Sequence, residues 1–222
     1  MEHDIMKIMT YLPLLLNASL ITLQCWITAG LVSLAIGTCA GILSCNKLTN
    51  PLRKKCIFLY TFIAKSIPAY VQILIAYFVI PALLNINISG MIAATTALAF
   101  CSSGYVTEII RSGINTISPG QWDACFVLGY SLPQTLRSVI LPQTFRNILP
   151  TLVGEFEQLL KSTSLLATIG ITELIRTGMN IISRELNPIP VYIIIACIFM
   201  FFSAILQTLT IFLEKRIRHD QH

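Results

Sequence analysis

The chain has 222 residues, of which 55% are hydrophobic and only 11% are charged, and its mean hydropathy is +0.76. Soluble domains carry roughly a quarter charged residues, so this composition argues against a water-soluble globular protein and favours the bilayer as the solvent. The net charge of +5 is compatible with nucleic-acid binding. The basic residues, however, cluster beside apolar segments, which is a pattern of membrane topology and not of a nucleic-acid-binding face.

Long apolar stretches predict the membrane spans. Residues 8–46, 66–107 and 186–213 contain no Asp, Glu, Lys or Arg, and each is longer than the roughly 20 residues that cross a bilayer. Residues 140–171 contain charges but are long and apolar enough to span. We therefore predict an all-α integral membrane protein with five transmembrane helices in a single transmembrane permease domain of residues 1–222. The predicted spans are residues 11–45, 56–84, 91–112, 140–171 and 190–213.

Two local features refine this prediction. Pro68 and Pro81 predict a kink inside the second span, since proline breaks the helical hydrogen-bond ladder. The basic clusters give the orientation, because positive residues concentrate on the cytoplasmic side. They comprise Lys47, residues 53–55 and residues 215–218, together with Arg111, Arg137 and Arg146. We therefore predict a multi-pass protein of the cytoplasmic (inner) membrane, with its N-terminus outside and its C-terminus in the cytoplasm.

The cytoplasmic connection, residues 118–138, contains signals for a short helix. Ser118 is the predicted N-cap, with Pro119 at the first helical position and Gln121 closing a capping box. Gly129 is the predicted C-terminal stop. This pattern indicates a helix with defined ends.

A second helix is predicted after the first, because Ser131 and Gln134 form another capping pair. The residues alone leave two roles open for the connection. Trp122, Phe126 and Leu128 suit a segment that lies on the lipid headgroups, and the same segment can bind a protein partner.

Sequence motifs add a family resemblance. Asp123-Ala124-Cys125, Gly129 and residues 139–142 (Val-Ile-Leu-Pro) resemble the loop motif of ABC importer permeases: Glu-Ala-Ala, three residues, Gly, nine residues, Ile-x-Leu-Pro. Over nearly the whole chain, further motifs resemble in order and spacing the permeases for polar amino acids of the His/Glu/Gln/Arg/opine type. These motifs are residues 65–72, 103–114, 118–122, 155–166 and 171–174.

The resemblance implies a type I ABC importer permease fold, in which the short cytoplasmic helix is a coupling helix that docks on a separate ATPase. The coupling residues that it implies are Gln121, Trp122, Asp123, Ala124, Cys125, Gly129, Leu141 and Pro142. Asp123 and Cys125 depart from the motif, but they keep the charge and the small size. The implied partners are the ATPase subunit, a second permease chain that is identical or similar, and a periplasmic or extracellular solute-binding protein.

Ionisable residues inside the spans suggest a substrate path. A free amino acid carries a carboxylate and an ammonium group, so its path needs partners of both signs. A charge at the bilayer centre costs at least about 2.5 kcal/mol, and it seldom persists without a partner or a function. The candidate substrate-pathway residues are Lys65, Ser103, Gly104, Tyr105, Glu108, Glu155 and Lys161.

Structural roles compete with this assignment for most of the candidates. Glu157 and Lys161 are four residues apart, which is the spacing of an intrahelical ion pair. Lys65 and Glu108 lie near the ends of their spans, where long side chains reach water. The small polar residues 103–105 serve helix packing as well as ligand approach. Glu155 has no basic residue three or four positions away, which favours a substrate role.

The chain contains no Gly-x-x-x-x-Gly-Lys-Ser/Thr loop, so ATP hydrolysis is expected in a partner and the chain is not expected to be an enzyme. We predict a permease subunit of an ABC importer that forms the path for polar amino acids, with no metal or other cofactor. Two alternatives remain open: an ion-coupled secondary transporter, and an intramembrane enzyme that uses Glu155 and Glu157. No nucleophile motif supports the enzyme.

Overall fold

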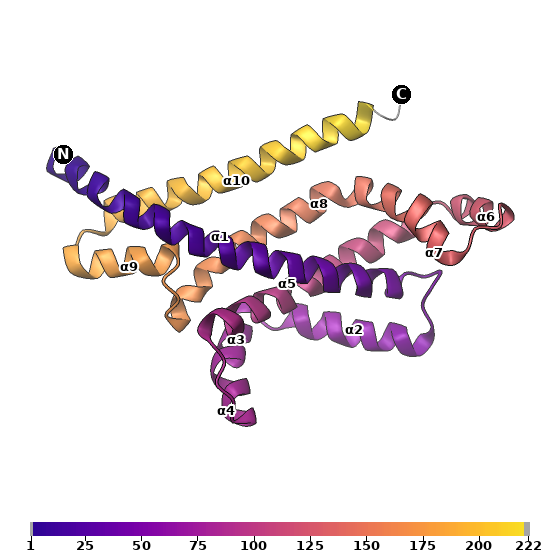
Figure 1. The fold of residues 1–222 in the computed structure, drawn as a ribbon, viewed down its shortest axis with the longest axis horizontal. Helices are drawn as coiled ribbons and strands as arrows, with labels where there is room; N and C mark the ends of the chain where they lie inside the picture. The colour runs from indigo at the N-terminus through magenta and orange to yellow at the C-terminus, as the bar shows by residue number, and fades with distance from the viewer. Residues whose placement is uncertain (1, 220–222) are drawn as a thin grey trace. The chain divides into compact units, whose positions relative to one another are not determined.

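The computed structural model describes residues 2–219, and it describes the side chains of residues 11–215. Every regular element in this range is helical (Figure 1), which confirms the predicted all-α class. The chain divides into two compact units, each built from three segments. Unit 1 comprises Met1–Leu31, Ile67–Cys101 and Phe156–Leu206, and unit 2 comprises Val32–Ser66, Ser102–Glu155 and Gln207–His222.

The first two predicted helical regions differ in continuity. The first is a single helix, α1 (Glu2–Ser44), as the uninterrupted apolar run predicts. The second is two helices: α2 (Pro51–Ser66), and a continuous helix made of α3 (Ala69–Leu74), the π-helix η1 (Ile75–Val79) and α4 (Ile80–Leu84).

The predicted kink at Pro68 is a complete break in the helix, because residues 67 and 68 lie outside both flanking helices. The residue before a proline is disfavoured in the α region, and proline has no N–H to donate. Pro81 lies near the start of α4 and directly after the π-helix η1, and the helix continues through it. One of the two prolines therefore interrupts the region, whereas the other lies inside a continuous helix beside a π-helical segment.

The remaining elements follow the predicted order with one addition. They are α5 (Gly90–Asn115), α6 (Pro119–Val127), α7 (Leu132–Thr135), the π-helix η2 (Leu136–Ile140), α8 (Leu141–Ser162), the 3-10 helix η3 (Thr163–Ile169), α9 (Leu174–Glu185) and α10 (Pro188–His219). Helix α9 was not predicted from the sequence. Its start is fixed by Glu173, whose carboxylate accepts hydrogen bonds from the N–H groups of Ile175 (2.9 Å) and Arg176 (2.8 Å).

Length and composition select only some of these helices as membrane spans. In the described part of the chain, Tyr11–Ser44 and Pro188–Lys215 are long and apolar enough to cross a bilayer. The number rises to four if two interrupted pairs each count as one span: Pro51–Ser66 with Ala69–Leu84, and Leu132–Ile169 with Leu174–Glu185. Helix α5 is not among them, and it contains many small polar residues. The count of five spans stays a prediction.

The core of unit 2 is formed by apolar side chains of α5 and α8. Val106 and Ile110 of α5 are fully buried. Helix α1 approaches α5 closely, because a Cβ atom built at Gly37 or Gly41 would lie 2.6 Å from the side chains of Val106 and Ile110. Glycines four residues apart on one helix face allow such contact between membrane helices.

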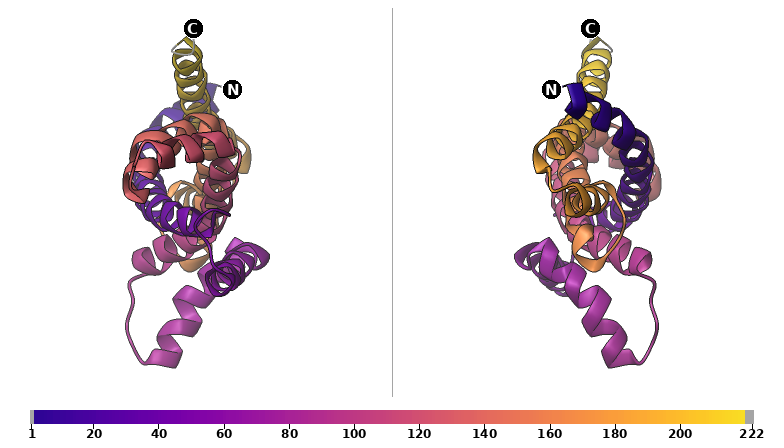
Figure 2. Two further views of the ribbon diagram at one scale, coloured as in Figure 1. Left: turned by 90° about the vertical axis from the view of Figure 1, so that its right-hand side faces the viewer. Right: turned by 90° about the vertical axis from the view of Figure 1, so that its left-hand side faces the viewer.

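Among the side chains that the structure describes, unit 1 has two apolar clusters. One of them joins α9 to α10 through Leu174, Ile181 and Ile195. In the other, Trp26 of α1 donates a hydrogen bond to the carbonyl of Phe156 at 2.8 Å. Figure 2 shows α3 to α4 projecting as an arm from the other helices of this unit.

Candidate functional site

The N-terminal end of α6 follows the prediction only in part. Ser118 is the N-cap and Pro119 begins the helix, but the Ser118 side chain forms no capping hydrogen bond. The predicted capping box with Gln121 is therefore wrong. The side-chain oxygen of Gln121 lies 3.5 Å from the amide nitrogen of Gln143 on α8, so Gln121 reaches toward a neighbouring helix and not back to its own N-cap.

The C-terminal end of α6 confirms the predicted stop. Gly129 has φ +76, a conformation that other residues rarely adopt. Its N–H donates to the carbonyl of Phe126 (3.0 Å), and the N–H of Tyr130 donates to the carbonyl of Cys125 (3.0 Å). These two bonds form a Schellman motif, which closes the helix and turns the chain away.

The second predicted capping pair is also confirmed. The backbone N–H of Ser131 donates to the side-chain oxygen of Gln134 at 2.8 Å, and α7 begins at Leu132. The chain therefore leaves α6 through Gly129 and restarts as a helix only three residues later. This short connection limits how far α6 can move independently of α7.

The predicted coupling residues lie on two faces. Cys125 is buried and Trp122 packs on the unit 2 core, so these two residues anchor α6. Leu141, in the first turn of α8, packs on the same core. The exposed members are Gln121, Asp123, Ala124, Gly129 and Pro142.

The end of α6 exposes three consecutive apolar side chains. Phe126 and Val127 are each 83% exposed, and Leu128 is 71% exposed. We call these three residues the α6 tip. Phe126 and Leu128 were predicted from the sequence as surface-contact residues, whereas Val127 was not. The signal that identifies the tip is an apolar run placed directly before a helix-stopping glycine.

A charged cluster joins α2 to α5 within unit 2. Lys65 forms an ion pair with Glu108, and its ammonium nitrogen lies 5.3 Å from the centre of the Tyr105 ring. The two charged side chains are 29% and 41% exposed. We call Lys65, Tyr105 and Glu108 the Lys65 cluster. Three predicted pathway residues therefore meet at one place, and a cation–π contact and an ion pair hold the lysine there.

Two further predicted residues hold the same helices together. Ser103 is buried, and its hydroxyl forms a hydrogen bond with that of Tyr60. A Cβ atom built at Gly104 would lie 2.7 Å from the Cβ of Ala64, so α2 and α5 touch at this glycine. The structure therefore gives Ser103 and Gly104 packing contacts, and it adds Tyr60, which the sequence analysis did not predict.

The carboxylates of α8 have different partners. Glu155 accepts a hydrogen bond from the Ser102 hydroxyl at 2.7 Å, and no described cation pairs with it. Glu157 pairs with Lys161 at 2.7 Å, as the four-residue spacing predicts. Because Lys161 is 54% exposed, this ion pair is a surface contact with a small effect on stability.

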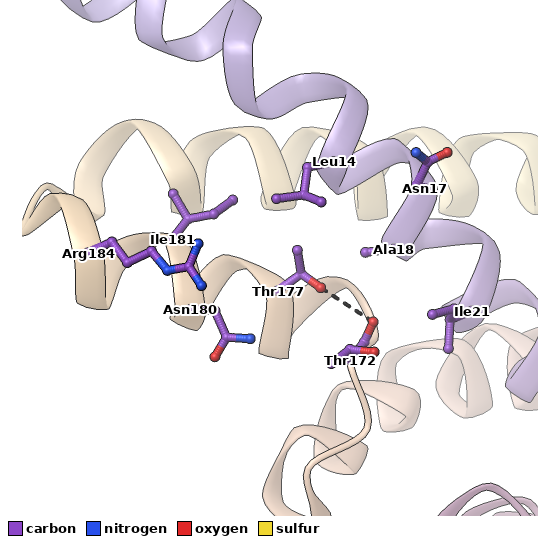
Figure 3. Close-up of a pocket in the computed structure, with 9 residues that line it drawn as sticks. All are labelled: Leu14, Asn17, Ala18, Ile21, Thr172, Thr177, Asn180, Ile181 and Arg184. Atoms are coloured by element: carbon purple, nitrogen blue, oxygen red, sulfur yellow. Dashed lines mark hydrogen bonds between the residues drawn. The ribbon is translucent and has the colours of Figure 1, made fainter.

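A pocket of about 390 Å³, lined by both apolar and polar side chains, lies between α1 and α9 in unit 1 (Figure 3). Its polar groups come from Asn17 on α1 and from Thr177, Asn180 and Arg184 on α9, with Thr172 just before α9. The Thr177 hydroxyl donates to the carbonyl of Thr172 at 3.3 Å. This pocket was not predicted from the sequence, because α9 was not predicted. Amide, hydroxyl and guanidinium groups of this kind bind carboxylates.

Comparison with known families gives the decisive finding. Residues 33–219 match the family described as "Binding-protein-dependent transport system inner membrane component". The chain belongs to this family. An inner membrane component of this kind is a multi-pass transport protein and not an enzyme. The ATPase that drives such a transport system is a separate subunit, and a substrate-binding protein completes it. Both alternatives left open by the sequence, the intramembrane enzyme and the secondary transporter, are thereby set aside.

Individual relatives agree with the family assignment. The arginine transport system permease protein ArtQ of Bacillus subtilis is 30% identical to this inner membrane component over 222 residues, which is 99% of this chain and 100% of ArtQ. A crystal structure of an amino acid ABC transporter with histidines is similar, with a TM-score of 0.85 and 31% identity, and the match covers 95% of this chain and 97% of that one. The MetNI methionine ABC transporter shares the fold, with a TM-score of 0.82 and 15% identity over 94% of this chain and 98% of that one.

Proposed function

We propose that this chain is the permease subunit of an ATP-driven importer for polar amino acids in the cytoplasmic membrane. The observation that carries the proposal is α6. It is anchored to the unit 2 core through Trp122 and Cys125, and it presents the apolar α6 tip on its exposed end. Exposed apolar surface on a helix with defined ends is typical of a protein-binding site. In this proposal the ATPase subunit binds there.

Two observations support polar amino acids as the substrates. ArtQ is named for arginine transport, and the similar solved structure is named as an amino acid ABC transporter. The Lys65 cluster and Glu155 supply charges of both signs, as the two charged groups of a free amino acid require. We propose that the path includes Lys65, Ser103, Gly104, Tyr105, Glu108 and Glu155, and that Lys161, which is exposed and paired with Glu157, lies at its margin without binding the substrate.

The proposed mechanism is a change of population between two conformations. ATP binding draws two ATPase subunits together and moves the α6 helices of two permease chains, which are identical or similar. The movement favours one access state over the other, inward-open or outward-open. The Schellman motif at Gly129 matters because it ties the motion of α6 to the segment that leads into α8.

The proposed orientation places the N-terminus outside and the C-terminus in the cytoplasm, with spans at residues 11–45, 56–84, 91–112, 140–171 and 190–213 in a single transmembrane domain. Helix α9 then belongs to an outer connection. The pocket beside Arg184 is in that case accessible to a periplasmic or extracellular binding protein.

Uptake into proteoliposomes tests the proposed function. The chain is reconstituted with its ATPase and binding protein, without an ion gradient, and labelled arginine and glutamine are supplied with the binding protein. We expect accumulation that depends on ATP hydrolysis. Uptake by this chain alone, driven by a proton or sodium gradient, would contradict the proposal.

A further inference from the structure

A basic groove of about 570 Å³ lies in unit 2 between the beginning of α2 and the C-terminal part of α5. Its cations are Lys54 and Lys55 of α2 and Arg111 of α5, and Phe58 provides an apolar wall. None of these four residues belongs to the Lys65 cluster or to the coupling residues. The groove shares Glu108 with the Lys65 cluster, but its three cations belong to neither set and need their own explanation.

The groove contains uncompensated positive charge. Its one carboxylate is that of Glu108, which is already paired with Lys65. No described carboxylate forms an ion pair with Lys54, Lys55 or Arg111. Three like charges along one groove repel one another, and a bound anion removes that repulsion.

The position of the lysines adds a second argument. The first turn of α2 contains no acidic residue, although the helix dipole favours negative charge at this end. Basic residues here oppose the dipole, and a phosphate group beside the lysines adds the negative charge that this end of the helix favours. The Asn50 side chain already accepts the N–H of Arg53 at 2.8 Å, so the lysine side chains and not the helix N–H groups would hold the phosphate. Arg53 has another partner, because its guanidinium donates to the carbonyl of Leu48 at 3.1 Å.

An apolar strip on α2 continues from the groove. Phe58 is 67% exposed and stacks on Phe62, which is 56% exposed, with 6.2 Å between the ring centroids. Leu59 is also exposed. A ligand with a charged head and apolar chains matches this arrangement, whereas free phosphate uses only its basic part.

We propose that the groove binds the phosphate headgroup of an anionic phospholipid of the inner leaflet, with its acyl chains along Phe58 and Phe62. The inference rests on the proposed orientation, which places the basic loop before α2 at the cytoplasmic surface. Basic pockets between transmembrane helices on that side suit anionic headgroups. Arg111 lies three residues from Glu108. When the lipid binds Arg111, this arginine does not compete with Lys65 for Glu108, and Glu108 stays paired with Lys65.

Binding of short-chain phosphatidylglycerol to the purified full-length chain tests the proposal, with phosphatidylcholine as the neutral lipid. We expect the chain to bind the anionic probe in preference. Substituting Lys54, Lys55 and Arg111 by Gln should lower the affinity about 100-fold, from a factor of about five for each basic residue. Replacing Lys54 and Lys55 by Arg should retain binding.

The matched control removes the same charge elsewhere in unit 2. Lys47, Arg137 and Arg146 are exposed and lie outside the groove, so their triple substitution by Gln should change the affinity less than twofold.

Equal losses in both triple variants, or equal binding of the two lipids, would overturn the proposal. Full displacement of the probe by inorganic phosphate would assign the groove to free phosphate. Loss of ATPase copurification without any lipid binding would make it a protein-docking surface. Either outcome leaves the proposed transport function intact.

Discussion

Two regions of unit 2 depart from the usual distribution of side chains in opposite ways. The α6 tip exposes apolar groups, with Phe126 and Val127 each 83% exposed. The Lys65 cluster instead draws charges inward, with Lys65 only 29% exposed. Exposed apolar patches and half-buried charges are both unfavourable without a partner. In our proposal the two regions have different partners: a protein surface for the tip, and a polar substrate for the cluster, whose own charges already form an ion pair.

Gly129→Val should have the largest effect on the protein-binding side of this comparison. Valine is strained at φ +76, because a left-handed conformation costs roughly 1–2 kcal/mol for residues with a side chain and more for a β-branched one. We expect the direction of α6 to change and copurification with the ATPase to be lost. Gly154→Val is the control, since a Cβ at Gly154 meets no atom within 4 Å. Unchanged copurification of the Gly129 variant would remove α6 from the docking surface.

Phe126→Ser tests the tip without altering the backbone. Burying a phenylalanine side chain contributes about 1.5–3 kcal/mol, so its loss should weaken ATPase binding about 10- to 100-fold. Titration of the reconstituted chain with the ATPase measures this effect. Leu83→Ser removes an apolar side chain that is 76% exposed in α4, and it should leave ATPase affinity unchanged. If the two variants behave alike, the α6 tip has no special role.

Glu155→Gln tests the substrate side, and its effect should be intermediate. The substitution keeps the shape and the acceptor for Ser102, which donates to Glu155 at 2.7 Å, but it removes the charge. We expect uptake to fall about tenfold, equivalent to about 1.4 kcal/mol of lost interaction with the substrate, while expression stays near wild type. Ser102→Ala controls for the hydrogen bond alone. Normal uptake by the Gln variant would exclude Glu155 from the path.

Lys161→Met should have the smallest effect. Lys161 is 54% exposed and is paired with Glu157 on its own helix, and such pairs contribute only about 0.3–0.5 kcal/mol. Uptake should therefore change less than about twofold. The melting temperature should change by no more than a few degrees. A tenfold loss of uptake with unchanged stability would instead show that Lys161 contacts substrate, as the family resemblance implies.

Local patterns in the sequence predicted much of this fold. An uninterrupted apolar run predicted α1, and a Ser-Pro start with a Gly stop predicted α6. Capping at Ser131 and the ion pair of Glu157 with Lys161 were predicted because each involves residues three or four positions apart. Interactions between residues close in sequence are the ones that spacing can reveal.

Residue spacing could not predict contacts between residues that are far apart in the sequence. Lys65 and Glu108 are 43 positions apart, so the sequence showed two candidates but not their pairing. The Ser118 capping box was wrong because Gln121 reaches toward Gln143, 22 residues away. Helix α9 and its pocket were missed because polar residues interrupt the apolar pattern, while Leu174 and Ile181 pack on α10. Tertiary packing decided each of these cases.

The central claim is that α6 lies on the cytoplasmic side and binds a separate ATPase. Labelling of a Phe126→Cys variant with a membrane-impermeant maleimide tests it most directly, in a background where the exposed Cys39, Cys56 and Cys197 are replaced by Ser. We predict labelling in inside-out vesicles, protection at an ATPase concentration high enough to saturate this weakened variant, and no labelling in intact cells. Labelling of intact cells at position 126 would contradict the account.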